Sequence, residues 1–247
     1  TYLKNLLKFP GNEATAGQLV DKGAAMDTSE SGKISLYRTM VATYEAQKKY
    51  ADAADWYKKI LNTKRNPTKT DIFNTANNYS RGGNYQAAID NWAVYISKYP
   101  NETYGYYMTG VTQAKIDTSM TLGLAAPSYQ KVIDLGEAQW ATDSVKVKAH
   151  LLNAYKYFIQ YAANVQKDKN IALDYVNKYL VKEPTDAEMI SIQKQLSAAP
   201  APKQPGQKPA ATKPATGTKP AGGTQPAASN TKPAATPTKS AATTKKK

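Results

Sequence analysis

The sequence predicts an all-α fold in which antiparallel helix pairs stack into a solenoid, and three observations support this prediction. First, five positions between 44 and 60 recur 35 residues later with aromatic, aliphatic or Ala residues. Second, the matched residues of each copy lie three and four apart, which places them on one face of a helix. Third, Gly82-Gly83-Asn84 marks a tight turn between two helices. The matched pairs are Tyr44 with Tyr79, Tyr50 with Tyr85, Ala53 with Ala88, Tyr57 with Trp92, and Ile60 with Tyr95.

This order of residues resembles the tetratricopeptide repeat family. Units of that family have an aromatic late in the first helix, then a small residue and an aromatic in the second helix, and a closing Pro. Here these are Tyr44, Ala53, Tyr57 and Pro67 in one unit, and Tyr79, Ala88, Trp92 and Pro100 in the next. The resemblance implies a binding scaffold in which the first helices of successive units line a concave groove.

The composition divides the chain into residues 1–197, a repeat domain, and residues 198–247, a tail. The tail has no aromatic or acidic residue and holds 9 of the 14 prolines and 9 of the 33 basic residues. The formal charge of +14 therefore divides into +9 for the tail and +5 for the rest. A segment with so little to bury does not offset its chain entropy. We therefore predict a disordered basic tail rich in Lys, Pro, Ala and Thr.

The sequence offers little chemistry for a catalytic site. It has no Cys, which excludes disulfides and thiolate ligands. His150 is the only histidine, and no carboxylate pair lies beside it at ligand spacing. We therefore expect no enzyme, no cofactor and no metal, and the lack of a long apolar run predicts no membrane span. The chain begins at Thr1 without Met, which indicates a processed chain or a piece of a longer one.

The first 32 residues allow two interpretations. Residues 2–9 and 13–27 read as helices, followed by a loop over 28–32. In one interpretation, the two helices form an irregular first unit. In the other, the segment 2–9 is the second helix of a repeat that Pro10 closes. The echo of Lys98-Tyr99-Pro100 in Lys8-Phe9-Pro10 favours the second interpretation.

Helix pairs are then predicted at 33–48 and 51–63, at 69–81 and 85–98, and from 103–115 onward. Asp117-Thr118-Ser119 is expected to cap the second helix of the third unit, with Pro127 in its first turn. The fourth unit runs from about 141 to 184, and its extra length between 157 and 170 predicts a first helix extended by about two turns. A last helix from Thr185 is expected to cap the solenoid.

The periodic pattern assigns two sets of residues. Packing between helices is predicted for Tyr44, Ala53, Tyr57, Ile60, Tyr79, Ala88, Trp92, Tyr95, Ala125, Tyr129, Tyr155, Ala172, Val176 and Tyr179. Out of phase with these, on the concave face, a partner-binding set is predicted: Arg38, Phe73, Asn74, Asn77, Arg81, Tyr104, Tyr107, Lys115, Lys146 and Asn153. The resemblance implies that Arg38, Asn74 and Asn77 suit a carboxylate, although the set of residues that grips two carboxylates is incomplete.

The leading hypothesis is therefore a non-catalytic adaptor that holds a peptide or partner protein in the groove, with the basic tail as a tether. One alternative is a protein associated with nucleic acid or another polyanion through the lysines of the tail. Another is a structural subunit of an envelope assembly. The basic tail and the lack of Cys resemble bacterial envelope-associated repeat proteins, which favours the periplasm or cell envelope over the cytoplasm.

Overall fold

The computed structural model describes residues 2–9 and 11–198, and within them the chain forms ten α-helices, one π-helix and no strand. The helices are α1 Tyr2–Leu6, α2 Glu13–Met26, α3 Glu30–Ala46, α4 Tyr50–Thr63, α5 Lys69–Arg81, α6 Tyr85–Lys98, α7 Thr103–Ile116, α8 Ala126–Tyr161, the π-helix η1 Ala162–Gln166, α9 Lys169–Lys182 and α10 Ala187–Ser197. The predicted all-α fold is confirmed. The predicted tail lies outside the described residues, apart from Ala198, and its disorder stays a prediction.

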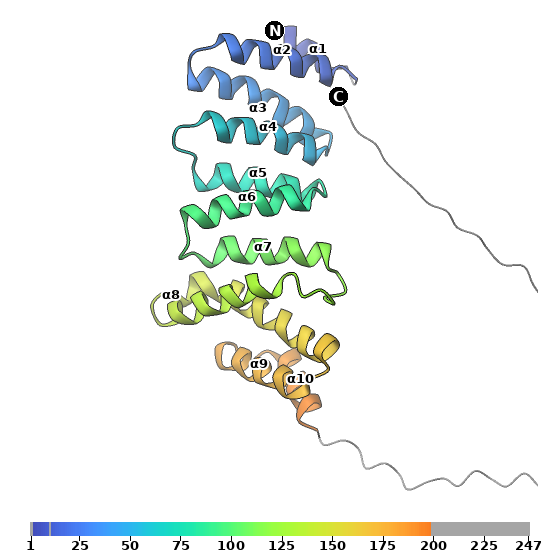
Figure 1. Ribbon diagram of the computed structural model, residues 1–247, viewed down its shortest axis with the longest axis vertical. Helices are drawn as coiled ribbons and strands as arrows, with labels where there is room; N and C mark the ends of the chain where they lie inside the picture. Colours follow the sequence, from blue (N-terminus) through green and yellow to red (C-terminus); the bar gives the residue numbers. More distant parts are fainter. Residues whose placement is uncertain (1, 10, 199–247) are drawn as a thin grey trace, which may run out of the picture. The chain divides into compact units, whose positions relative to one another are not determined.

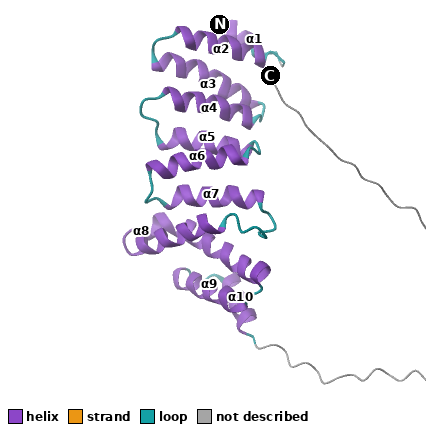
Figure 2. Ribbon diagram, in the orientation of Figure 1, coloured by secondary structure: helices purple, strands orange, loops and turns teal. Residues whose placement is uncertain are grey.

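Each helix packs antiparallel on the next, so the helices form a single stack (Figures 1 and 2). α3, α5, α7 and the second half of α8 are the first helices of successive units. α4, α6, the first half of α8, and α9 are the second helices. The contacts are almost all between neighbours in sequence, which is the packing expected of a solenoid.

The core lies between the two helices of each unit and between adjacent units. Ala53, Ala88, Ala125 and Ala172 are each at most 1% exposed. A small residue at these points lets two helices approach closely, while the ring of Trp92 fills the space beside them with no exposure at all. The other predicted packing residues are also buried, except that Tyr44 and Tyr57 are half-buried.

The α5–α6 unit follows the predicted bounds, 69–81 and 85–98, and its local chemistry explains them. Thr68 and Asp71 form a reciprocal capping box at the start of α5. The turn after α5 uses Gly83 with φ +80°, a left-handed conformation that favours glycine. The Asn84 side chain accepts from the Ala87 amide at 3.3 Å and caps α6.

Helix α3 begins three residues earlier than predicted, at Glu30, so Glu30, Ser31 and Gly32 are helical rather than part of a loop. The reason is local capping. The Ser29 hydroxyl accepts from the Gly32 amide at 3.0 Å. The Asp27 carboxylate in turn accepts from the Ser29 amide at 2.8 Å, which fixes the turn before the helix.

The expectation that Asp117 caps the second helix of the third unit is wrong. Asp117 ends α7 instead, and α8 begins only at Ala126. Its carboxylate accepts from the amides of Leu122 at 3.0 Å and Leu124 at 3.4 Å, so it organises the intervening loop. Pro127 does lie in the first turn of α8, as predicted.

Two predicted helices of the third and fourth units join into α8, where only Asp143 departs from helical dihedrals (φ −149°, ψ 52°). The predicted start of the fourth unit near 141 is therefore a kink, not a loop. The first helix of this unit then continues through Tyr161 into η1, which ends at Gln166. The predicted extension between 157 and 170 is confirmed, and Lys167 ends it with φ +57°.

The favoured interpretation of the N-terminal segment is wrong, because α2 and not α1 holds the place of a second helix. Ala16 of α2 is fully buried, like Ala53 and Ala88 in the later second helices. Gly17 lies against Trp56, whose ring would be 3.2 Å from a Cβ at that position. The segment is therefore an irregular unit with a short α1.

Candidate binding groove

A cleft of about 440 Å³ lies between α3 and α5, the first helices of two successive units. Its floor includes Tyr57 and Ile60 of α4, and its walls bring Arg38 of α3 and Asn74 of α5 to one site. Both are predicted partner-binding residues, and their helices are consecutive first helices of the stack. The cleft is therefore part of the predicted groove.

Arg38 is the residue on which the clefts of this region converge. It lines the α3–α5 cleft, a second cleft of about 600 Å³ beside Leu7 and Ala46, and a third of about 510 Å³ beside Glu30 and Ile34. The residue is exposed, and its guanidinium has no ion pair or hydrogen bond within residues 2–9 and 11–198. A planar cation with its donors free suits a carboxylate or phosphate ligand.

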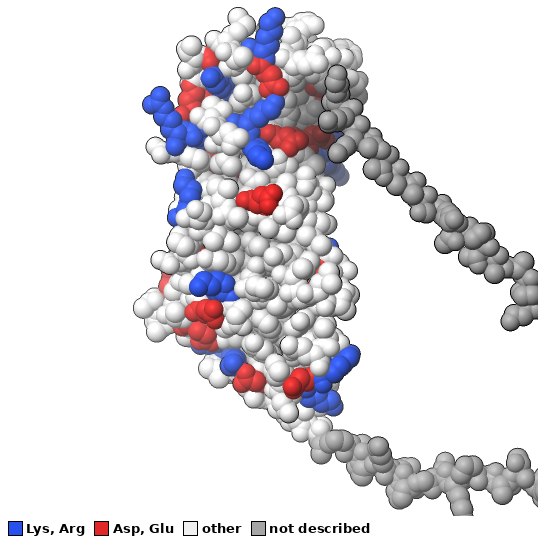
Figure 3. All heavy atoms as spheres, viewed as in Figure 1, with Lys and Arg blue, Asp and Glu red and all other residues white. Residues whose placement is uncertain are grey.

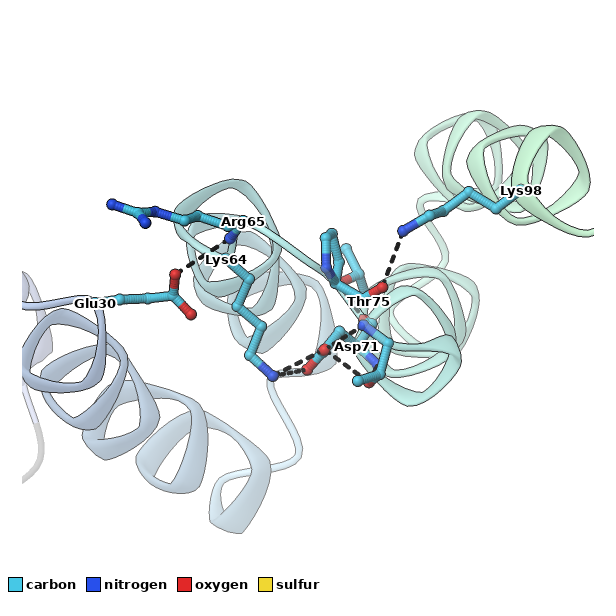
Figure 4. Close-up of polar contacts among 8 residues, drawn as sticks. Glu30, Lys64, Arg65, Asp71, Thr75 and Lys98 are labelled. Atoms are coloured by element: carbon cyan, nitrogen blue, oxygen red, sulfur yellow. Dashed lines mark hydrogen bonds and ion pairs between the residues drawn. The ribbon is translucent and has the colours of Figure 1, made fainter.

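Lys64 and Asp71 form the most enclosed ion pair of the cleft wall. The two oxygens of Asp71 lie 2.7 and 2.8 Å from Lys64 Nζ, and the side chains are only 18% and 12% exposed. Figure 4 shows Lys64 reaching from the α4–α5 loop toward this carboxylate. Burial raises the pKa of Asp71, but the hydrogen bonds from Lys64 and Thr68 lower it more, so the pKa stays below its ordinary value.

The same close-up shows how the α4–α5 loop is held at the edge of the cleft. Glu30 accepts from the Arg65 amide at 3.2 Å, and Lys98 donates to the Pro67 carbonyl at 3.0 Å (Figure 4). The Thr75 hydroxyl bonds the Asp71 carbonyl within α5 at 2.9 Å. These contacts come from the two units on either side of the loop, so they fix the wall of the cleft and do not depend on a ligand.

Glu45 is the acid at the base of the cleft. It accepts from the Tyr57 hydroxyl and from Asn78 Nδ2, each at 3.3 Å. Burial, and then the nearby Glu45 charge, raise the pKa of Tyr57. Glu45 therefore joins three helices, α3, α4 and α5. Because Arg38 is exposed in the same cleft, the cleft carries both signs of charge.

Further along the stack the predicted groove residues pack mostly on one another. Tyr104 lies 6.3 Å from Phe73 and 6.0 Å from Trp92, measured between ring centroids. Tyr107 stacks on His150 at 4.7 Å. Phe73, Tyr104 and Tyr107 are only half-buried, so they form an aromatic inner wall that still presents part of each ring.

His150, the only histidine, belongs to this wall. Its Nδ1 lies 2.8 Å from the Thr103 hydroxyl at the start of α7. Burial among these groups lowers the pKa of His150. The residue therefore joins α8 to α7 and provides no ligand set.

The remaining predicted groove residues are not gathered at one site. The Arg81 guanidinium lies 3.7 Å from the centre of the Tyr50 ring, and Lys115 donates to the Ser80 hydroxyl at 3.1 Å. Asn153 contacts the Tyr107 hydroxyl at 3.4 Å. Lys146 is exposed near Glu102, and Asn77 is half-buried. The structure thus joins Arg38 with Asn74 in a cleft, and spreads the others along the inner helices.

Sequence reasoning missed the Lys64–Asp71 pair as part of this site. Lys64 lies in a loop between units, where the helical phase used to find groove residues does not apply. The capping-box pattern Thr68-x-x-Asp71 was a usable signal for the position of Asp71. Nothing in the sequence indicates that Lys64, seven residues earlier, reaches the same carboxylate.

Charged side chains are unevenly spread over the face drawn in Figure 3. They gather over α2 to α4 and again over the last helices, with few across the middle of the stack. The described helices hold no cluster of three or more His, Cys, Asp or Glu that suits a metal ion. None of these helices is both long and apolar enough to cross a bilayer.

The geometry matches a known repeat architecture. The C-terminal part of a TPR repeat-containing protein from Cytophaga hutchinsonii superposes with a TM-score of 0.56 and 19% sequence identity, over 77% of this chain and 71% of that one. This chain has the tetratricopeptide repeat fold. A tetratricopeptide repeat protein from Parabacteroides merdae is also similar, with a TM-score of 0.44 and 15% identity over 75% of this chain and 66% of that one. No protein-family profile and no curated protein matches the sequence.

Proposed function

We propose that this protein is a non-catalytic scaffold that binds an extended peptide segment of a partner protein in the groove along α3 and α5. The observation that carries the proposal is the position of Arg38, an exposed guanidinium at the meeting point of three clefts. A segment lying across α3 contacts all three clefts. The tetratricopeptide repeat fold supports such a role, because its first helices line an extended inner surface.

The chemistry of the groove favours a segment with an acidic side chain. Arg38 offers a bidentate partner to a carboxylate, and the exposed Ala42 and Ala46 give an apolar wall to the adjoining cleft. Lys64 contributes little attraction, because Asp71 already neutralises it. Recognition by the exposed cations Arg38 and Lys8 and a shallow apolar wall is consistent with a transient partner of moderate affinity.

The proposal is tested by panning the full chain against a displayed library of random peptides and measuring the affinity of the enriched peptides. We expect Arg38→Glu to weaken binding at least tenfold, about 1.4 kcal/mol, while circular dichroism and melting stay unchanged. Arg65→Glu is the matched control, because Arg65 is exposed nearby but lines none of the three clefts. Enriched peptides that bind the two variants equally well would place the site elsewhere.

Binding of a polyanion by residues 198–247 is a second candidate. The observation that favours it is that these residues hold nine lysines and no acid. Such binding is weak, independent of sequence and strongly salt-dependent, with a slope of log K against log salt of about −0.9 for each phosphate contacted on duplex DNA. Comparing DNA with an anionic cell-wall polymer over a salt series separates a general polycation from a nucleic-acid protein.

A further inference from the structure

The turns between the first and second helix of each unit all lie along one edge of the stack. Figure 1 shows the α3–α4, α5–α6 and α7–α8 turns on the same side, with the α1–α2 turn and the start of α9 following them. Antiparallel pairing makes this arrangement necessary, because every second connection returns to the same side. We call this surface the turn edge and define it as residues 7–9, 11–13, 45–52, 81–84, 115–125 and 167–169.

The turn edge is rich in exposed basic residues. They are Lys8, Lys48, Lys49, Arg81, Lys115, Lys167 and Lys169. Most of its acids are already engaged within the fold. Glu13 pairs with Gln47 and Lys49, and Glu45 points into the α3–α5 cleft. Asp117 is buried beneath its loop, Asp168 caps α9, and Asp52 alone is exposed in the first turn of a helix.

Helix capping explains part of this charge. Cations near the C-terminus of a helix stabilise its dipole, and several of these residues follow or end a first helix. That explanation needs no ligand. It does not account for the large apolar side chains that the same edge exposes.

The end of α7 and the α7–α8 loop present three aliphatic side chains to solvent. Ile116, Leu122 and Leu124 are 45%, 72% and 37% exposed, and Phe9 at the α1–α2 turn is 67% exposed. The loop has a defined conformation, because Asp117 accepts two of its backbone amides. The leucines are therefore held outward by a built loop.

The loop makes the third unit longer than the repeat, and the extension of the fourth unit at the end of α8 supports this loop. Gly123, with φ +63°, lies so close to Tyr161 that a Cβ there would come 2.9 Å from the Tyr161 hydroxyl. Tyr161 ends α8, just before η1, in the extension of the fourth unit. The two additions to the repeat length thus meet at the turn edge. Insertions in repeat proteins lie on one face, which is often the binding face.

We propose that the turn edge docks on an anionic lipid surface. Ile116, Leu122 and Leu124 enter the boundary between headgroups and acyl chains, while the nearby cations contact the phosphates. Exposed aliphatic residues flanked by lysines fit a lipid surface, in which one layer offers both negative charge and apolar volume. A nucleic acid would use the lysines but has no apolar layer for the leucines. The turn edge adjoins the clefts beside Arg38, because Glu45, Ala46 and Gln47 line them. Ile116, Leu122 and Leu124 line none of the three clefts, so the proposal does not rest on the function proposed above.

The absence of Cys allows a site-specific test on the full chain. Leu122→Cys is labelled with an environment-sensitive fluorophore and mixed with vesicles of phosphatidylcholine, with or without phosphatidylglycerol. We expect the emission to shift to the blue only with the anionic vesicles. Val145→Cys is the matched control, because Val145 is 91% exposed at the opposite edge, by the kink of α8, and its label should not respond.

Sedimentation with the same vesicles measures the partition coefficient of the full chain between water and membrane. Leu122→Ser should lower the partition coefficient about tenfold, and Lys167→Gln about fivefold. Val145→Ser should leave it unchanged. A full chain that sediments while the label at position 122 does not respond would overturn the proposal and leave the contact to residues 198–247. An equal response of that label to duplex DNA would overturn it in favour of a nucleic-acid surface.

Discussion

The Tyr95 hydroxyl donates a 2.7 Å hydrogen bond to Glu102, the residue at the N-cap of the next helix. Lys69 contacts the other oxygen of Glu102. The same hydrogen bond, again between residues seven apart, joins the Tyr179 hydroxyl to Asp186, the N-cap of α10, also at 2.7 Å. An aromatic late in a second helix thus ties its unit to the start of the following one, in addition to packing in the core.

Tyr95→Phe removes this tie but keeps the ring. We expect a loss of about 1.5–3 kcal/mol in the free energy of unfolding, the range for a hydrogen bond to a charged group. Urea denaturation of the full chain measures it. Tyr99→Phe is the control, because no hydrogen bond of the Tyr99 hydroxyl is found among the described residues. Equal losses in the two variants would show that the Tyr95 hydroxyl is not a stabilising link.

Asp71→Asn should make the fold less sensitive to acid. The folded-state pKa of Asp71 lies below its ordinary value, so its charged form stabilises the fold above the unfolded pKa. This stability is lost as pH falls through the folded pKa. In the variant that part of the pH dependence disappears, and the lost cap and ion pair cost about 1–2 kcal/mol near neutral pH. Melting from pH 7 downward tests this, and parallel curves would contradict it.

The burial of Ala88 predicts that the same Ala→Leu substitution has different effects on stability at two positions of α6. Ala88 is fully buried, so Ala88→Leu overpacks the core and should cost about 1–3 kcal/mol. Ala93 is exposed on the same helix, and Ala93→Leu should be nearly neutral. Trp92→Ala should cost about 3–5 kcal/mol by leaving a cavity. Thermal melts of the three variants check the phase of the repeat.

The two glycines of the α5–α6 turn should differ in how much stability is lost when each is replaced by Asn. Gly82 has an ordinary φ of −80°, but a Cβ there would come 2.4 Å from the Ala51 backbone nitrogen in α4. Gly83 has φ +80° with open space around it. We expect Gly83→Asn to be tolerated, since Asn tolerates this conformation, and Gly82→Asn to destabilise strongly. Denaturant midpoints that fall equally would refute the contact with Ala51.

Much of the fold followed from local pattern. The bounds of α5 and α6 and the phase of Ala88 and Trp92 were predictable, because a repeated helical period and a cap are properties of neighbouring residues. The groove was predictable only in part. Arg38 and Asn74 were found from their phase, whereas Lys64 lies in a loop and reaches the cleft through a contact that no period encodes.

The sequence by itself determined the helix pairs, their stacking and which face of each helix is apolar, since these depend on spacing along the chain. Only the tertiary structure decided that Asp117 organises the α7–α8 loop instead of capping α8. Tertiary packing alone also placed Gly123 against Tyr161, and Gly82 against Ala51. The physical reason is that a side chain or a glycine meets partners many residues away only after the units have stacked, and local propensity carries no information about that distance.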